Sequence, residues 1–575
     1  MLKRVFSYMR EYKKYAWLGL LCIGVEVVLE ITVPLLMADL IDYGVTNADG
    51  TYIIKKGLQM ALCAVLALIL GVGSAKFSAL AGQGLGANIR KAEYEKLQSY
   101  SFSNIDHFSV SSLVTRLTSD VTNIQNAVST GMRPFGRSPV MLIFATSFAF
   151  RINSTLALVF LVALPTLAVL LILIIINVGP LYGRMQSAID QVNRCIQENL
   201  TAIRVVKSYV RGDYEVEKFG VVNENLKSES EKAFGTAVLN MPAMQFVMYG
   251  TILGILLIGG RLINEGQMMI GQLTSFLSYV LLILNSLMMM SNVFLLMTRS
   301  LASAERIMEV IDEKIDITDE NAKDIAVAKG EIEFDHVWFK YKDTAKEYVL
   351  SDVSFHIKPG QTVGIIGQTG SSKTTLVQLI PRLYDVTKGE VKIDGINVKE
   401  YPVRHLRDAV AMVLQKNTLF SGSLIGNLHW GNENATLDEI KEACQIACVD
   451  EFVDRLADGY DTEMGQEGVN VSGGQKQRIC IARAILKKPK VLILDDSTSA
   501  VDTATEAKIR SGLAEKLPDM TKIIIAQRIS SVRHADQIII MDRGHVEAIG
   551  THESLLRDNQ IYQEIYASQK EGADL

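Results

Sequence analysis

Hydrophobic residues fill six long runs in the first half of the chain, whereas the second half alternates short apolar runs with polar segments. The pattern thereby changes from long helices to short strands. A helix needs about 20 mostly apolar residues to cross the roughly 30 Å hydrocarbon core of a membrane. The sequence therefore predicts six transmembrane helices, near residues 16–42, 56–82, 135–151, 154–180, 240–262 and 270–296.

The distribution of basic residues orients these helices. Lys and Arg concentrate at the N-terminus and in two long polar stretches, roughly 83–134 and 181–239, whereas the other loops carry few. The positive-inside rule then places both termini and both long stretches in the cytoplasm. Only the short segment 151–154 separates the third and fourth runs, so a tight turn is expected there.

From about residue 329 the chain alternates β-branched strands with helical stretches, as in QTVGIIG, VLILDD, KIIIAQ and QIIIMD. This alternation is typical of an α/β nucleotide-binding domain. We expect a multidomain protein, with an all-α transmembrane domain over residues 1–311, a polar linker over 312–328 and the α/β domain over 329–575.

Composition narrows the function classes. The net charge of −5 is small and gives no indication of nucleic-acid binding. The six cysteines are scattered and form no CxxC pair, so neither a disulfide framework nor a zinc site is predicted. The first apolar run is too long for a signal peptide and follows a basic segment without a cleavage site, so it is expected to be a membrane helix.

A phosphate-binding loop is predicted in residues 364–375, GIIGQTGSSKTT, where a strand enters a Gly/Ser-rich loop and a helix begins near Lys373. Backbone N–H groups of such a loop form a positive nest for phosphates. Lys373 would reach the β and γ phosphates, and Thr374 would hold Mg²⁺. Ser372 replaces the Gly of the strict pattern. We expect Ser372 to adopt right-handed helical angles, with ATP binding kept at altered affinity.

Two further segments complete the nucleotide-binding pattern. Asp495 ends an aliphatic strand and offers a carboxylate for Mg²⁺. Residues 471–478 read VSGGQKQR. With these motifs the chain resembles the ATP-binding cassette (ABC) family over nearly its whole length. The resemblance implies that this signature sequence caps ATP bound to a second ATPase domain, through Ser472, Gly473, Gly474 and Gln475.

The same resemblance assigns further roles. Tyr341 stacks on adenine, Gln415 senses Mg²⁺ and contacts the membrane domain, and residues 499–502 form the D-loop. Thr374, Gln415 and Asp495 are the expected Mg²⁺ ligands. The expected ATP-binding residues are Tyr341, Gly367, Gln368, Thr369, Gly370, Ser371, Ser372, Lys373, Thr374, Thr375 and Gln415.

Two residues depart from the family pattern. Asp496 stands where the family usually has a Glu that polarises the attacking water, and Gln527 stands where it usually has a His. Asp is one methylene shorter, and a misplacement of about 1 Å can cost ~10²-fold in rate. Gln can donate a hydrogen bond but cannot carry a proton's charge. The pair predicts a slow or non-hydrolytic site, although a working ATPase with conservative replacements stays open.

Candidate substrate and coupling residues lie in the first half. Glu26 and Glu30 share one helical face. Charges in lipid are expensive, so these side chains serve either cationic substrates or, as protonated acids, hydrogen bonds between helices. Met288, Met289 and Met290 offer flexible thioethers to apolar substrates, or simply fill space. Arg116 and Tyr209 lie in stretches that resemble the family's coupling helices, and Tyr209 is expected to enter the partner's ATPase domain.

Six spans and one ATPase domain resemble an ABC exporter half-transporter. The intact signature beside a weakened site favours a heterodimer whose second half-transporter carries Glu and His. The expected function is export of amphipathic drugs or lipid-like molecules across the plasma (inner) membrane of a bacterium, driven by ATP with Mg²⁺. A homodimeric exporter, a lipid flippase and an ATP-gated regulatory or channel-like subunit are the alternatives.

Overall fold

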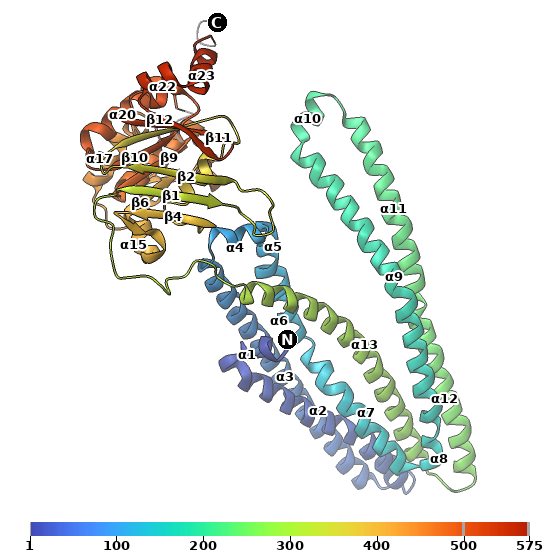
Figure 1. Cartoon of the computed structure of the whole chain (residues 1–575). Helices are drawn as coiled ribbons and strands as arrows, with labels where there is room; N and C mark the ends of the chain where they lie inside the picture. Colours follow the sequence, from blue (N-terminus) through green and yellow to red (C-terminus); the bar gives the residue numbers. More distant parts are fainter. Residues whose placement is uncertain (1, 497–500, 572–575) are drawn as a thin grey trace. The chain divides into compact units, whose positions relative to one another are not determined.

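The computed structural model describes residues 2–496 and 501–571, and the chain divides into two compact units (Figure 1). Unit 1 comprises Met1–Leu97 and Ser111–Asp312, and unit 2 comprises Gln98–Val110 and Glu313–Leu575. Residues 98–110 therefore belong to the strand-containing unit, although they lie in the first long polar stretch after the second apolar run.

Unit 1 is built from helices, several of which are far longer than the average for globular proteins. They are α1 (Leu2–Ser7), α2 (Lys13–Asp39), α3 (Gly50–Gln98), α5 (Val110–Thr115), α6 (Val121–Ser129), α7 (Met132–Ile152), α8 (Ser154–Ala157), α9 (Val159–Thr201), α10 (Ile203–Ser208), α11 (Gly212–Val238), α12 (Asn240–Asn264) and α13 (Ile270–Asp312).

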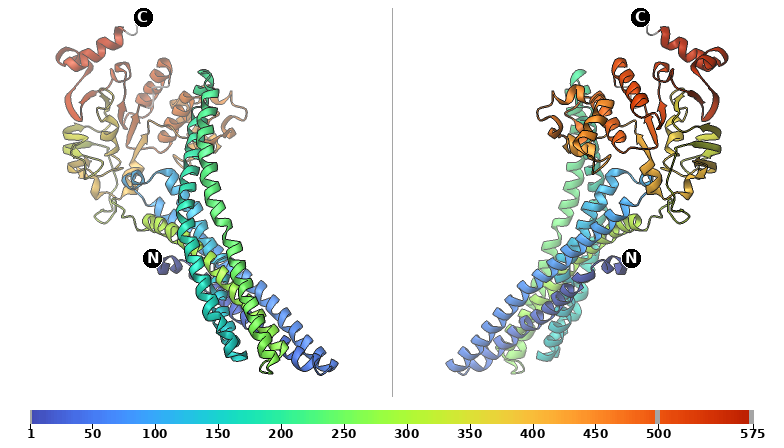
Figure 2. Two further views of the ribbon diagram at one scale, coloured as in Figure 1. Left: turned by 90° about the vertical axis from the view of Figure 1, so that its right-hand side faces the viewer. Right: turned by 90° about the vertical axis from the view of Figure 1, so that its left-hand side faces the viewer.

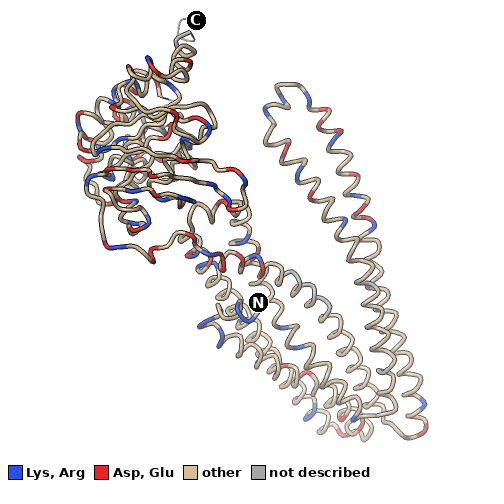
Figure 3. The backbone as a smooth tube through the Cα atoms, in the orientation of Figure 1, with Lys and Arg blue, Asp and Glu red and all other residues tan. Residues whose placement is uncertain are grey.

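Helix length and apolar content confirm four of the six predicted spans. Among the described residues, the segments long and apolar enough to cross a membrane are Arg10–Val45, Gly50–Gln98, Gly212–Asn264 and Ile270–Met290. The other two predicted spans coincide with α7 and α9 and stay predictions. Figure 3 shows long stretches without charged residues in the lower part of these helices.

The core of unit 1 forms where α2, α7 and α13 pack together. Ile23, Val27 and Ile31 of α2 are almost fully buried, as is Met141 of α7. Asn153 ends α7, and its side chain accepts a 3.0 Å hydrogen bond from the backbone of Leu156. This cap produces the predicted tight turn, because it stops one helix and starts the next.

Helices α9 and α11 form a long antiparallel hairpin with α10 at its tip (Figures 1 and 2). The apolar parts of α9 and α12 pack against each other, whereas α11 carries many charged residues. The second polar stretch therefore continues the helices, as the sequence predicted.

Unit 2 contains a central mixed sheet, a smaller antiparallel sheet and surrounding helices. Its strands are β1 (Ile332–Phe339), β2 (Leu350–Ile357), β3 (Thr362–Ile366), β4 (Lys388–Ile393), β5 (Ile396–Asn397), β6 (Val410–Val413), β7 (Gly422–Ser423), β8 (Glu463–Met464), β9 (Val491–Asp495), β10 (Thr521–Ile525), β11 (Gln537–Asp542) and β12 (His545–Gly550).

The helices of unit 2 are mostly short. They are α4 (Phe102–His107), α14 (Lys373–Gln378), α15 (Val403–Ala409), α16 (Leu424–His429), α17 (Leu437–Ile446), α18 (Asp450–Val453), α19 (Gly473–Leu486), α20 (Thr503–Lys516), α21 (Ile529–Val532), α22 (His552–Asp558) and α23 (Gln560–Glu571).

The central sheet has the order β12-β11-β3-β10-β9-β6, and all its neighbours except β12 and β11 pair in parallel. In this register Ile525 lies opposite both Ile365 and Asp495. The carboxyl ends of β3, β9 and β10 therefore meet at one edge, which is where ligands bind in open α/β sheets. The second sheet, of order β2-β1-β4-β5, is antiparallel.

Helix α4 packs on the rest of unit 2 through polar contacts and an aromatic contact. Tyr384 donates a 2.6 Å hydrogen bond to Asp106, and the ring of Phe102 meets the ring of Tyr384 edge-on. Asn104 donates to the carbonyl of Lys314 at 2.8 Å. The sequence pattern predicts helices in this stretch but did not indicate that this one belongs to unit 2. Its local signal is the capping pattern that begins at Ser101.

Candidate functional site

The edge where β3, β9 and β10 end holds a cavity of ≈ 320 Å³. The loop after β3, the two acids at the end of β9 and Gln527 after β10 all reach it, because parallel pairing aligns these strand ends. Residues from several of the sequence motifs therefore lie around one cavity. Its lining residues are Thr369, Gly370, Ser372, Lys373, Thr374, Thr375, Gln415, Asp495, Asp496, Ile525 and Gln527.

Lys373 provides the positive charge of this cavity. Its ammonium donates hydrogen bonds to the carbonyls of Gly367 and Gln368, at 2.9 and 2.8 Å, and contacts Ser371 Oγ at 3.2 Å. Burial lowers the pKa of Lys373, and the neighbouring carboxylates of Asp496 and Asp495 oppose that shift. Because these hydrogen bonds hold the ammonium against the loop, its positive charge can attract a phosphate bound there.

Ser372 contradicts one prediction. Its backbone has φ = 71° and ψ = 23°, which is the left-handed conformation and not the expected right-handed helical one. Gly adopts this region freely, whereas any residue with a Cβ pays about 1–2 kcal/mol. The loop therefore keeps the backbone path of its glycine-containing pattern, at the cost of strain at Ser372.

Replacing Ser372 with glycine is expected to relieve this strain. Glycine loses more chain entropy on folding, which offsets part of the gain and leaves roughly 0.5–1 kcal/mol. The unfolding midpoint of the ATP-binding domain in the full-length protein should rise by roughly 2 °C. The matched control is Ser371→Gly, where φ is not positive and a contact with Lys373 is lost, so the midpoint should fall. A midpoint that falls for Ser372→Gly would contradict this account.

Thr374 and Asp495 form an oxygen-rich corner. The Thr374 hydroxyl donates a 3.0 Å hydrogen bond to Asp495 Oδ1, and Asp495 is buried. Burial raises the pKa of Asp495. Hydroxyl, carboxylate and amide oxygens suit a hard cation such as Mg²⁺, and Gln415 lines the same cavity. The three expected metal ligands therefore fit that role.

The side chains of Asp496 and Gln527 form a hydrogen bond with each other. The Gln527 amide donates a 2.8 Å hydrogen bond to Asp496 Oδ2. Burial raises the pKa of Asp496, and the bond from Gln527 partly offsets this increase. The backbone of Asp496 has φ = 48°, so the acid also sits in the left-handed region. One carboxylate oxygen is thus directed at an amide.

Tyr341 lies beside the same loop. Its hydroxyl is 2.8 Å from Thr375 Oγ1, and its ring meets the ring of Tyr384 edge-on at 5.2 Å. The side chain keeps substantial exposure. The ring is thus held close to the start of α14. Its stacking on adenine stays a prediction.

The signature begins α19. Ser472 caps the helix, and its side chain and that of Gln475 form reciprocal hydrogen bonds with the backbone, at 3.3 and 2.8 Å. Among the described residues, none of the signature lines the cavity around Lys373. Of the predicted D-loop, Ser499 and Ala500 lie outside the described residues, and Asp502 caps α20.

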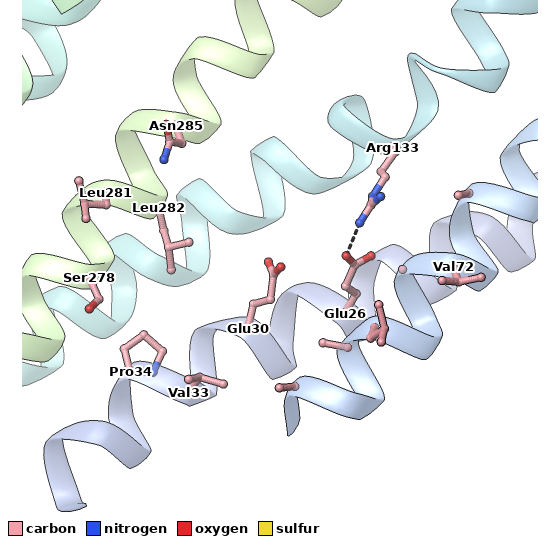
Figure 4. Close-up of a pocket in the computed structure, with 15 residues that line it drawn as sticks. Glu26, Glu30, Val33, Pro34, Val72, Arg133, Ser278, Leu281, Leu282 and Asn285 are labelled. Carbon is pink, nitrogen blue, oxygen red and sulfur yellow. Dashed lines mark hydrogen bonds and ion pairs between the residues drawn. The ribbon is translucent and has the colours of Figure 1, made fainter. Parts of the chain in front are cut away.

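A second cavity, of ≈ 780 Å³, lies among α2, α3, α7 and α13 (Figure 4). Glu26, Glu30 and Arg133 line it. Arg133 contacts Glu26 at 2.5 Å, and Arg137 contacts Glu30 at 2.7 Å. Sequence reasoning placed both carboxylates on one face but missed both arginines, because the pairing of α2 with α7 leaves no local pattern.

The other candidate residues of unit 1 are more scattered. Met288 packs against the hydrophobic core of unit 1, whereas Met289 and Met290 are exposed. None of the three lines the second cavity. Arg116 is buried against α13, where it contacts Glu309 at 2.8 Å. Tyr209 follows α10 and is 75% exposed. Their substrate and coupling roles stay predictions.

Family comparisons agree with both units. The ABC transporter transmembrane region family matches residues 16–287, and the ABC transporter family matches residues 350–499. The chain is 38% identical to the uncharacterized ABC transporter ATP-binding protein YfiB of Bacillus subtilis (strain 168), over 100% of both chains.

Two relatives have more descriptive names. The putative multidrug export ATP-binding/permease protein YgaD of Bacillus subtilis (strain 168) is 31% identical, covering 99% of both chains. The ATP-dependent lipid A-core flippase of Pseudomonas putida (strain KT2440) is 32% identical, covering 98% of this chain and 96% of the relative.

A solved structure shows the same fold. A bacterial Atm1-family ABC exporter with ATP bound matches with a TM-score of 0.82 at 24% identity, covering 98% of both chains. Together with the nucleotide-binding geometry of unit 2, these matches establish the family. The chain belongs to the ABC transporters and is an ATP-hydrolysing half-transporter of the exporter type, with a helical transmembrane domain followed by an ATP-binding domain.

Proposed function

We propose that this chain is the catalytically weak subunit of a heterodimeric ABC exporter. The observation that carries the proposal is the hydrogen bond between Gln527 and Asp496. Both positions normally serve hydrolysis in the family, and here an amide holds a shortened carboxylate. The second half-transporter would supply the Glu and His that this chain lacks.

The chain keeps the groups that bind ATP. Phosphoryl transfer depends mainly on positioning and electrostatic stabilisation. Lys373 and the loop amides would hold the phosphates, Tyr341 would stack on adenine, and Thr374, Asp495 and Gln415 would hold Mg²⁺. Bound Mg²⁺ would neutralise charge on the phosphate oxygens.

The same site lacks a well-placed group for activating water. The Asp496 carboxylate is one methylene short and already accepts the Gln527 amide proton. A neutral amide at residue 527 cannot add positive charge beside the γ-phosphate. ATP bound here would therefore persist through many turnovers of the transporter.

The intact signature would act on the partner's ATP. Ser472 and the first amides of α19 form a helix N-terminus, which attracts phosphate charge. Because this N-terminus does not line the chain's own nucleotide cavity, it is available to a second ATPase domain. The competent site of the complex would combine the partner's loop and acids with this chain's signature.

The transported molecules would be amphipathic small molecules, either drugs or lipid-like compounds. The names of two relatives, a putative multidrug exporter and a lipid flippase, support this class. The large cavity of the helical unit has mainly apolar walls, which suits such molecules. A bacterial plasma membrane, with the ATPase domain and both termini in the cytoplasm, is the location that the charge pattern favours.

The ATPase rate of the purified full-length chain, at saturating Mg-ATP, tests this proposal. The chain alone should hydrolyse ATP near background, and co-expression with the half-transporter encoded beside it should restore turnover. Vigorous turnover by the chain alone would favour the homodimeric exporter. Ion flux without uphill accumulation of any substrate would favour the channel-like alternative.

A further inference from the structure

Four charged side chains form a balanced cluster beside the large cavity of unit 1. Glu26 and Glu30 come from α2, and Arg133 and Arg137 come from α7. Arg133 contacts Glu26 at 2.5 Å, while Arg137 contacts Glu30 at 2.7 Å and Glu26 at 3.7 Å. Two carboxylates and two guanidinium groups sum to zero, so the cluster offers both signs of charge without net charge.

Groups of both signs face the cavity. Glu26 is 3% exposed, and its Oε2 has no hydrogen-bond partner among the described residues. The Arg133 side chain is 39% exposed and also lines the cavity, whereas Arg137 is not part of its wall. Figure 4 shows Glu26 and Arg133 directed at each other across the gap between α2 and α7. The wall therefore places a buried carboxylate, one oxygen of which has no hydrogen-bond partner among the described residues, next to one accessible cation.

The neighbouring wall leaves room for this pair and is otherwise mainly apolar. A Cβ at Gly71 would lie 3.1 Å from Glu26 Oε1 and 3.2 Å from Arg133 Nη2, so glycine permits the close approach of α3. The rest of the wall consists largely of aliphatic side chains, among them Val33, Leu68 and Leu281. A ligand that fills the cavity would meet both the charges and hydrocarbon.

We infer that this cavity binds a zwitterionic amphipath, with an ammonium group on Glu26 and a phosphate or carboxylate group on Arg133. The inference rests on the proposed export function and names its substrate class. A zwitterionic substrate takes the place of the cationic substrate that would be expected if the two glutamates were unpaired. The apolar chain of the ligand would lie along the aliphatic wall.

Electrostatics in a low-dielectric wall favours this class over singly charged ligands. A cation that takes Glu26 from Arg133 leaves the Arg133 guanidinium without its partner. An anion that takes Arg133 leaves the buried Glu26 carboxylate with only its longer contact to Arg137, at 3.7 Å. Removing one member of a buried ion pair is strongly unfavourable. A zwitterion exchanges one internal pair for two intermolecular pairs, so every charge keeps a partner. An uncharged ligand gains nothing from the cluster.

Three fluorescent probes with the same labelled alkyl chain test the inference. They end in phosphocholine, trimethylammonium or phosphate. Their binding is measured on the purified full-length transporter, reconstituted with its co-expressed half-transporter. The phosphocholine probe is expected to bind at least about tenfold more tightly than the other two, since each 1.4 kcal/mol is a factor of ten. Equal binding of all three probes, or tighter binding of either singly charged probe, would overturn the inference.

Single substitutions in the charged cluster distinguish a loss of recognition from misfolding, because each should change which of the three probes binds most tightly. Glu26→Gln should shift it toward the phosphate probe, and Arg133→Gln toward the trimethylammonium probe. The double variant Glu26→Gln/Arg133→Gln keeps charge balance and should bind the three probes alike. The matched control is Arg261→Gln, which breaks an exposed pair with Glu265 and should leave all affinities unchanged. Uniform weakening by both single variants would contradict the assigned roles.

Two further measurements are needed. One identifies the source of the ligand, and the other tests the proposed export separately from binding. A labelled two-chain phosphatidylcholine tests for a bilayer lipid, whereas binding of the single-chain probe alone identifies a soluble amphipath. ATP-driven movement into vesicles tests export. If the zwitterion preference holds but ATP moves no probe, export fails and the binding inference stands. If ATP moves probes without regard to headgroup charge, export stands and the binding inference fails.

Discussion

Replacing Ser472 with alanine is expected to lower ATP turnover of the assembled transporter at least about a hundredfold, because loss of one donor to a developing phosphate charge costs about 10²–10³ in rate. Ser472 lies at the N-terminus of α19, outside its own nucleotide cavity. The loss would therefore arise at the partner's site. Steady-state phosphate release from the purified heterodimer measures it.

Two control variants test whether the loss comes from the phosphate contact of Ser472 and from the partner's site. Ser423 also caps a helix of the ATPase domain, and it accepts a hydrogen bond from the backbone of Gly426 at 3.1 Å. Ser423→Ala loses a cap worth about 1 kcal/mol without touching a phosphate site, so turnover should hold. Asp496→Asn should also leave turnover nearly unchanged. If Asp496→Asn reduced the rate as much as Ser472→Ala, both sites would be hydrolysing and the asymmetric proposal would fail.

Introducing glutamate at Asp496 together with histidine at Gln527 is expected to give the chain's own site hydrolytic activity. The longer side chain moves the carboxylate by about 1 Å, and a displacement of that size can change rates ~10²-fold. Histidine can carry positive charge next to the γ-phosphate. The ATPase rate of the purified chain alone should rise from background by at least about tenfold, since its signature can complete a site in a second copy.

The single variants test whether the two residues act as a unit. Asp496→Glu alone leaves the carboxylate bonded to an amide, and Gln527→His alone leaves the carboxylate short. Each should recover less than the pair, because residues in one hydrogen-bonded unit are not additive. A double variant that stays at background would show that other features silence the site, with the strained turn at Ser372 the first to examine.

The local sequence determined the kind of each domain and most of the nucleotide site. Apolar runs and β-branched alternation depend on neighbours along the chain, so they predicted the helical unit and the α/β unit. Motifs identified Asp495, Gln527 and the residues of the phosphate loop, and the sheet then brought most of them to one cavity. Parallel strands align their carboxyl ends whatever the distance between them in sequence.

Tertiary structure decided the features that depend on partners far along the chain. The left-handed turn at Ser372 follows from the path that the loop must take between β3 and α14, and that path overrides the preference of serine. Helix α4 belongs to unit 2 because Asp106 meets Tyr384, 278 residues away. Glu26 became half of an ion pair only when α2 packed on α7. Sequence periodicity predicts which residues share a face of a helix. Which charged residues of another helix contact that face depends on tertiary packing.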